Sequence, residues 1–332
     1  MRSHPIHRGH DRTSSGPRCG SRTATASKVA GDLYVPKNAK GALPALVVSG
    51  PFGAVKEQSS GLYANELARR GYVTLAFDPS FTGESGGSVR DVASPDIYTE
   101  DYSAAVDFLG LRKIADRERI GAMAVCGLSG MALTAAAADS RIKAVATASM
   151  YDMSRSMSRG HQDYYTREQR QKVVDHLSRQ RWIDAENGTY ARLSHEVPFD
   201  QNGNVAPTNR VLPKTLPPDA DPITRIFFDY YRTDRGFQPR SINSTTAWTA
   251  TTPMSFFAFP LMTNIDMLAP RKALLVAGAD AHSRYYSEDV RAMAPGTVDL
   301  LIVPGADHVD LYDRKHLIPF DRLDEFFTTN LA

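Results

Sequence analysis

The residues of this 332-residue chain that are best suited to chemistry are a nucleophile, an acid and a histidine, in that order. Cys126 and Ser129 lie in the run A-V-C-G-L-S-G. Asp280 follows the apolar run K-A-L-L-V-A, and His308 follows V-D-L-L-I-V. A histidine that is oriented by a carboxylate can take the proton from a thiol or hydroxyl and so activate it. This order therefore predicts a triad that forms a covalent acyl-enzyme.

The sequence around Cys126 predicts a strand, a tight turn and a helix. Residues 120–125 are apolar or small, as in a strand that is buried on both faces, and residues 131–138 are rich in helix formers. This succession is the geometry of a nucleophile elbow, in which backbone amides at the helix N-terminus stabilise a developing oxyanion. The alternative is an ordinary strand–helix unit in which Cys126 is a small buried residue.

The choice of nucleophile lies between Cys126 and Ser129. Counting from the start of the strand places Cys126 at the turn, with Gly127 directly after it. A thiol at a helix N-terminus beside a protonated histidine is expected to have a lowered pKa. We therefore favour Cys126 and keep Ser129 as the alternative. The expected oxyanion donors are the backbone N–H of Gly127 and one from Phe52 or Gly53, in the loop G-P-F-G.

The acid and the histidine also have alternative interpretations. His308 follows a glycine just beyond a predicted strand, where an imidazole can reach inward, although a surface position is the alternative. Asp280 could instead cap the next helix. Glu288 is a weaker candidate acid because it is expected on that helix, and Asp307 is expected to point away. His282 either lines the pocket or is exposed.

The literal G-x-S-x-G pattern of serine hydrolases occurs elsewhere, around Ser85. It follows a predicted strand end by several residues, and no helix is expected after it, which is the wrong context for an elbow. We therefore reject Ser85 as the nucleophile and interpret this segment as a glycine-rich loop near the mouth of the pocket.

Alternating strands and helices are expected to position these residues. The predicted fold is an α/β fold with a mainly parallel, doubly wound sheet that is covered by helices on both faces. In such a sheet the loops that follow the strands gather at one edge, which brings the predicted site residues together. The expected strands are 31–36, 43–49, 72–77, 119–126, 142–148, 272–277 and 298–303, and the expected helices are 59–70, 98–113, 287–293 and 320–330.

Two segments depart from this alternation. Residues 150–268 contain a polar helical stretch over 162–184, a proline-rich stretch over 196–222 and an aromatic helix over 223–231. We expect this segment to be a helical lid inserted into one domain over 29–332. The aromatic residues suggest an apolar acyl or aromatic substrate. Residues 1–28 are basic, and we expect a disordered leader. The leader has histidines at positions 4, 7 and 10, but without a frame of carboxylates or cysteines we expect no metal there.

The composition excludes several classes of function. A net charge of +2 gives no case for nucleic acid or a membrane surface, and no apolar run approaches the ~20 residues that a membrane span needs. The two cysteines are far apart, so we expect no disulfide framework and a cytoplasmic location. The glycine-rich segments lack the spacing of dinucleotide-binding and phosphate-binding loops, so we expect no cofactor.

Five segments carry a family resemblance: residues 50–58, 77–87, 124–133, 278–288 and 303–313. Together they resemble the α/β-hydrolase superfamily, and more narrowly its dienelactone-hydrolase-like branch. Within that branch they resemble the family that joins fungal polyketide transferases to bacterial hydrolases. The resemblance implies an α/β-hydrolase fold and a Cys or Ser nucleophile with Asp and His, with a small acyl ester or thioester as the partner. We expect a hydrolase, with an acyltransferase that uses an alcohol, or a non-catalytic binding protein, as alternatives.

Overall fold

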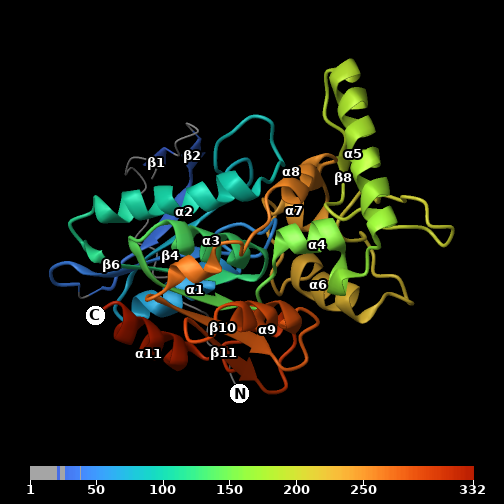
Figure 1. Cartoon of the computed structure of the whole chain (residues 1–332). Helices are drawn as coiled ribbons and strands as arrows, with labels where there is room; N and C mark the ends of the chain where they lie inside the picture. Colours follow the sequence, from blue (N-terminus) through green and yellow to red (C-terminus); the bar gives the residue numbers. More distant parts are fainter. Residues whose placement is uncertain (1–20, 23–26, 38) are drawn as a thin grey trace.

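A sheet of seven strands forms the centre of the computed structural model, which describes residues 21–22, 27–37 and 39–332 (Figure 1). Neighbouring strands are parallel, except that β3 runs antiparallel to β5 at one edge. The predicted mainly parallel sheet is therefore confirmed. In spatial order the strands are β11 (Val298–Val303), β10 (Lys272–Gly278), β7 (Ile142–Ala148), β6 (Ala115–Val125), β4 (Leu43–Ser49), β5 (Val73–Phe77) and β3 (Gly31–Tyr34).

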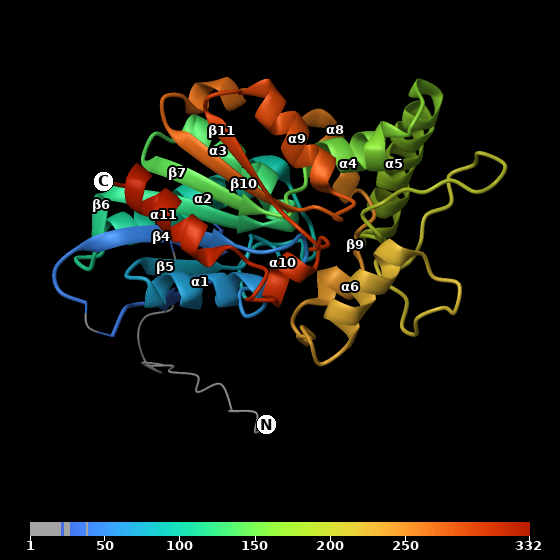
Figure 2. The ribbon, with the colours of Figure 1, turned by 90° about the horizontal axis from the view of Figure 1, so that it is seen from below.

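Helices cover both faces of this sheet, because alternate side chains of each strand point to opposite faces. In β4, Val47 packs on one face, whereas Leu46 and Val48 pack on the other. Both faces are apolar, which explains why the central strands are near-continuous apolar runs. Figure 2 shows the two helical layers. One layer contains α2 (Pro95–Gly110), α3 (Ser129–Ala138) and α9 (Arg284–Met293), and the other α1 (Ser59–Arg69), α10 (Asp310–Asp313) and α11 (Phe320–Asn330).

The segment between β7 and β10 lies beyond one end of the sheet (Figures 1 and 2). Its longest helix, α5 (Arg167–Asn187), begins later than position 162 because Thr166 and Gln169 form a capping box. It ends at Gly188, which has a left-handed conformation. The other elements are α4 (Met153–Arg159), η2 (His161–Asp163), β8 (Arg192–Leu193), α6 (Pro222–Arg232), α7 (Ile242–Thr245), β9 (Trp248–Thr249), α8 (Thr252–Ala258) and η3 (Ile265–Leu268).

Near the N-terminus, β1 (Ser21–Arg22) pairs with β2 (Lys28–Val29). Most of the basic leader, including the three histidines at positions 4, 7 and 10, lies outside the described residues. Within the described ranges, no helix is both long and apolar enough to cross a membrane.

Candidate active site

A sharp turn separates β6 from α3 and presents Cys126. The strand ends at Val125, a single 3₁₀ turn (η1, Cys126–Leu128) follows, and α3 begins at Ser129. Cys126 has a φ of 58°, in the left-handed region that residues other than glycine rarely adopt. This strand–turn–helix geometry is that of a nucleophile elbow, with Cys126 at its apex.

The thiol of Cys126 contacts the imidazole of His308. The distance from Sγ to Nε2 is 3.3 Å, and both side chains are buried. The backbone carbonyl of His308 accepts a hydrogen bond of 2.7 Å from Ser149 Oγ, just after β7. The end of β10 also lies so close to the loop after β11 that a Cβ atom on Gly278 would be only 2.2 Å from the carbonyl oxygen of Ala306. This contact fixes the loop that carries His308.

The backbone amides of Phe52 and Gly127 both donate hydrogen bonds to Sγ of Cys126. A substrate carbonyl that is attacked by Sγ would therefore develop its negative charge close to these donors. Gly127 makes the close approach possible, since a Cβ atom there would be only 2.5 Å from Cβ of Phe52. Gly53 contributes differently: its carbonyl accepts a hydrogen bond of 3.0 Å from Ser241 Oγ, which joins this loop to the inserted segment.

The residue that orients His308 differs from the predicted one. Nδ1 of His308 hydrogen bonds to the Oγ of Ser283 at 2.6 Å, and Ser283 is buried. Asp280 is exposed, and its backbone N–H donates to the carbonyl of Ala306 at 3.0 Å. No described hydrogen bond joins Asp280 to His308, so the prediction of Asp280 as the triad acid is not supported by this geometry. The loop after β10 is bound to the loop after β11 at Asp280, and the side chain that reaches His308 comes from Ser283, later in the same loop.

The two serines considered as nucleophiles, Ser129 and Ser85, both lie away from His308. Ser129 is completely buried at the start of α3, and its Oγ has no hydrogen-bond partner among the described residues. Ser85 Oγ donates to the carbonyl of Asp78 at 2.6 Å and accepts from the amide of Ala30 at 2.8 Å. Neither serine is brought to His308, whereas Cys126 is.

The two alternative acids are also engaged elsewhere. Oδ1 of Asp307 accepts hydrogen bonds from the amides of Val309 and Asp310, each at 2.8 Å, so this carboxylate points away from the imidazole, as predicted. Glu288 is exposed on α9 and pairs with Arg284 at 2.7 Å. Asp307 therefore stabilises the local backbone, and Glu288 forms a surface ion pair.

A tyrosine that the sequence analysis did not single out completes the contacts of His308. Oη of Tyr312, on α10, is 3.0 Å from Nε2 of His308, and the hydroxyl also interacts with Sγ of Cys126. Tyr312 is fully buried. The sequence signal was its spacing of four residues from His308, which places two side chains on one face of a short helical turn.

Aromatic side chains from the inserted segment and from the loop after β10 surround His308. Phe227 on α6 packs against His308 with ring centroids 5.4 Å apart. His282 lies beside His308 at 4.8 Å, and its Nε2 is 2.6 Å from the hydroxyl of Tyr151. Of the two interpretations of His282, the structure therefore shows the one in which it lies beside the site. These contacts close the site in this structure.

Burial sets the protonation of the two reacting side chains. Removal from water raises the pKa of Cys126 to about 11, although hydrogen bonds from Tyr312, Phe52 and Gly127 oppose this increase. Burial, and then the neighbouring His282, lowers the pKa of His308 well below its usual 6.5. The pair is therefore neutral at pH 7, and the expected lowering of the thiol pKa is wrong for this closed site, because desolvation exceeds the stabilisation of the thiolate.

His282 gives this region a measurable dependence on pH. Burial, and then His161, lowers the pKa of His282 from its ordinary 6.5 to about 4. Its neutral form stabilises the fold above pH 6.5, and this contribution is lost as the pH falls toward 4, because the unfolded chain then binds a proton that the folded chain does not. Between pH 7 and pH 4, the free energy of unfolding of the wild type is expected to fall by about 3 kcal/mol relative to His282→Gln. Chemical denaturation at both pH values measures this difference, and equal losses in the two proteins would contradict it.

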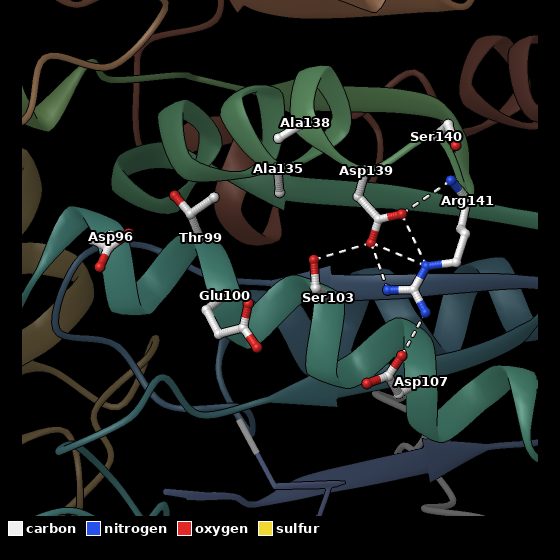
Figure 3. Close-up of a pocket in the computed structure, with 10 residues that line it drawn as sticks. All are labelled: Asp96, Thr99, Glu100, Ser103, Asp107, Ala135, Ala138, Asp139, Ser140 and Arg141. Atoms are coloured by element: carbon white, nitrogen blue, oxygen red, sulfur yellow. Dashed lines mark hydrogen bonds and ion pairs between the residues drawn. The ribbon is translucent and has the colours of Figure 1, made fainter. Parts of the chain in front are cut away.

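A polar hollow on the surface is separate from this site. It lies between α2 and the end of α3 that is remote from Cys126 (Figure 3). Asp139 in it is held by Arg141 at 2.7 Å and by Ser103 at 3.0 Å. Within the described part of the chain, no group of three or more His, Cys, Asp or Glu residues has an arrangement that could hold a metal ion. The hollow is thus an ion-paired surface. Its lining residues are Asp96, Thr99, Glu100, Ser103, Asp107, Ala135, Ala138, Asp139, Ser140 and Arg141.

A family model described as X-Pro dipeptidyl-peptidase (S15 family) matches residues 26–204, which is more than half of the chain. The chain belongs to the S15 family. The matched region contains the loop with Phe52 and the elbow with Cys126, and it ends before the strand that precedes His308. The predicted membership of the α/β-hydrolase superfamily is confirmed.

The chain is also similar to a bacterial protein of known structure and, in fold, to a fungal hydrolase. An uncharacterised protein of Pseudomonas aeruginosa, PA2218, is 53% identical over 304 residues, 91% of this S15-family chain and 77% of its own. Its crystal structure has a TM-score of 0.86 at 52% identity, covering 94% of this chain and 92% of that one. An α/β hydrolase from Penicillium sp. sh18, GrgF, shares the fold alone, with a TM-score of 0.75 at 16% identity over 94% of this chain and 98% of that one.

Two fungal relatives with described activities match shorter stretches. The thiohydrolase aneE of Aspergillus aculeatus is 37% identical over 123 residues, which is 37% of this chain and 38% of its own. The acyltransferase drtE of Aspergillus calidoustus is 32% identical over 106 residues, which is 32% of this chain and 34% of its own.

Proposed function

We propose that this chain hydrolyses a thioester or ester through a covalent intermediate on Cys126. The observation that carries the proposal is the position of Sγ, 3.3 Å from Nε2 of His308 and hydrogen-bonded to two backbone amides. A nucleophile, a base and oxyanion donors that meet at one atom are the parts that acyl transfer needs. The similarity to a thiohydrolase supports the same class of reaction.

The reaction proceeds in two balanced steps. In the first, the Cys126 proton passes to Nε2 of His308 while Sγ attacks the substrate carbonyl, and the amides of Phe52 and Gly127 hold the oxyanion. The bond from the carbonyl carbon to the leaving group then breaks, and His308 protonates the departing thiol or alcohol. In the second, His308 takes a proton from water, the hydroxide attacks the acyl-enzyme, and Cys126 leaves as the reprotonated thiol with a carboxylic acid as product.

The hydroxyl partner of His308 favours a thiol nucleophile. A buried carboxylate in a triad stabilises the imidazolium, and its removal from a serine protease costs roughly 10⁴-fold in kcat. Ser283 supplies a dipole in place of that negative charge. A thiol is more acidic than an alcohol and therefore needs less help from its base. This difference supports Cys126 as the nucleophile.

The chemistry of the leaving group favours thioesters and esters over peptides. When Sγ attacks an amide, the tetrahedral intermediate must expel an amine in preference to the better-leaving thiolate, so the amine must be protonated as it leaves. Burial lowers the pKa of His308 and no described carboxylate contacts it, so the imidazolium that would deliver this proton is poorly populated. A dipeptide arylamide with proline in second place, the substrate type that the family description suggests, is therefore expected to react more slowly than a thioester.

A second candidate is acyl transfer to an alcohol, which the closed site favours. Cys126 is only 6% exposed, and aromatic side chains cover His308, so water has little access to an acyl-enzyme. The similarity to an acyltransferase supports this candidate. Product analysis after addition of alcohols distinguishes the two, because a transferase forms a new ester in place of the free acid.

Trapping the acyl-enzyme tests the proposed function. The protein is exposed briefly to activated esters, thioesters and the dipeptide arylamide, and its peptides are then examined by mass spectrometry. We expect the acyl mass on the peptide that contains Cys126, its loss in Cys126→Ala, and its retention in Ser129→Ala. Ser129 is the matched control because it is also buried and lies three residues away. Acyl mass that is lost only in Ser129→Ala, or no acyl mass with any substrate, contradicts the proposal.

A further inference from the structure

We propose that Tyr312 is a catalytic residue that carries the proton between Cys126 and His308 and then stabilises the Cys126 thiolate. This inference rests on the proposed function, because it assigns a role in the same nucleophilic step. Oη of Tyr312 is 3.0 Å from Nε2 of His308. The Tyr312 hydroxyl also interacts with Sγ of Cys126, which lies 3.3 Å from the same nitrogen. The phenol therefore lies beside both atoms that exchange the proton.

The hydrogen-bonding capacity of His308 explains why a third group is needed. A neutral imidazole has one donor and one acceptor nitrogen. When Oγ of Ser283 accepts the Nδ1 proton, Nε2 is left as the single acceptor. Two donors then compete for it, the Cys126 thiol at 3.3 Å and the Tyr312 hydroxyl at 3.0 Å. A thiol is a weak donor, so the phenol binds Nε2.

The thiol proton then has the phenol oxygen as its acceptor. In the relay, the Cys126 proton moves from Sγ to Oη while the phenol proton moves from Oη to Nε2. One S–H and one O–H bond break, and one O–H and one N–H bond form, which leaves a thiolate, a neutral phenol and an imidazolium. The new phenol O–H donates back to the thiolate. In the reverse direction the same relay returns a proton to Sγ after deacylation.

The surroundings keep Tyr312 protonated. Burial, and then the neighbouring Cys126 and Tyr231, raises the pKa of Tyr312 well above 10, so it acts as a donor at neutral pH. The titratable groups that face it are His308 and Cys126, Tyr230 and Tyr231 from α6, and Tyr151 just after β7. Burial likewise raises the pKa values of all three tyrosines above 10, so none of them titrates in the range of the test.

Alkylation of Cys126 as a function of pH tests this role without a substrate. The rate of reaction with iodoacetamide is followed by mass spectrometry on the peptide that contains Cys126, because the chain has a second cysteine, Cys19. In Tyr312→Phe the thiolate loses one donor, and we expect the midpoint of alkylation to rise by about one pH unit, a tenfold loss of thiolate at neutral pH. Acylation by a thioester is expected to slow roughly 10- to 100-fold.

Tyr63→Phe is the matched control. Tyr63 is buried on α1, and its hydroxyl donates to the carbonyl of Leu311 on α10 at 2.7 Å. This variant therefore removes a tyrosine hydroxyl that contacts the helix of Tyr312, away from the sulfur. We expect its alkylation midpoint to equal that of the wild type. Unchanged alkylation and acylation in Tyr312→Phe would overturn the proposal, and so would equal shifts in the two variants.

A fluorinated tyrosine at position 312 keeps the inference testable if Tyr312→Phe does not fold. This residue retains the hydroxyl and lowers its pKa, so it is a stronger donor, and the alkylation midpoint is expected to fall below that of the wild type. An unchanged midpoint would overturn the proposal. The alkylation midpoints of Tyr312→Phe and of the fluorotyrosine variant can shift as expected while no substrate acylates the wild type. That result would contradict the proposed function but support the interaction of Tyr312 with the Cys126 proton.

Discussion

Replacing His308 with glutamine is expected to slow acylation of Cys126 by roughly 10⁴-fold. Glutamine can keep one hydrogen bond but cannot take the thiol proton. The pKa of Cys126 is raised to about 11, so almost no thiolate forms at neutral pH without a base. Single-turnover kinetics with a chromogenic thioester, under conditions in which acylation is followed directly, measures the effect.

His316→Gln is the control for this variant, because it removes an exposed imidazole from the same segment of the chain. Its acylation rate is expected to match that of the wild type. Circular dichroism and the unfolding temperature establish that His308→Gln retains the fold. A folded His308→Gln protein that acylates within tenfold of the wild type would show that His308 is not the base.

Gly127→Ala is expected to lower kcat about 10²- to 10³-fold, the loss that follows removal of one oxyanion donor. The added Cβ would lie 2.5 Å from Cβ of Phe52, so the loop that carries the Phe52 amide must move away from the sulfur. Because the donors act on the transition state, KM is expected to change much less than kcat. Steady-state kinetics separates the two constants.

Gly110→Ala is a suitable control for the added methyl group. The nearest atom to a Cβ at Gly110 is 3.7 Å away, an ordinary van der Waals distance. Its kcat and KM are expected to equal those of the wild type. A loss in Gly127→Ala that appears only in KM, or that parallels a general loss of stability, would contradict the role given to Phe52 and Gly127.

The sequence predicts the elbow and the histidine because both depend on local patterns. An apolar strand, a small turn residue and a helix-forming run place Cys126 at its turn without reference to the rest of the chain. His308 follows a strand at the same sheet edge, and parallel topology alone brings it close to Cys126. The bulky residue after the turn, Leu128, is accommodated because its side chain is buried in the core.

The partner of His308 could not be predicted from such patterns. Asp280 follows its strand as expected, but the loop passes Ala306 so closely that Ser283, three residues later, reaches the imidazole. That outcome depends on the packing of two loops distant in sequence. A serine hydroxyl also carries no sequence signal of its own, because serines are common in loops.

Tyr312 was missed for a related reason. Tyr312 lies on a short helix, α10, whose four residues are too few to form a recognisable periodic pattern. Spacing of four residues from a histidine has meaning only once a helical turn is known to join them. The inserted segment is similar: its helices α5 and α6 lie close to the expected positions, but which of their side chains meet the site is decided by tertiary packing.

The aromatic cover over Cys126 also has a kinetic consequence. With the thiol 6% exposed and Phe227 against His308, a substrate reaches the sulfur only after the cover moves, so every turnover includes an opening event that is independent of the leaving group. For esters of increasing intrinsic reactivity, we therefore expect kcat to level off at a common ceiling. At that ceiling we expect the rate to depend on solvent viscosity and no longer on electronic substitution of the leaving group.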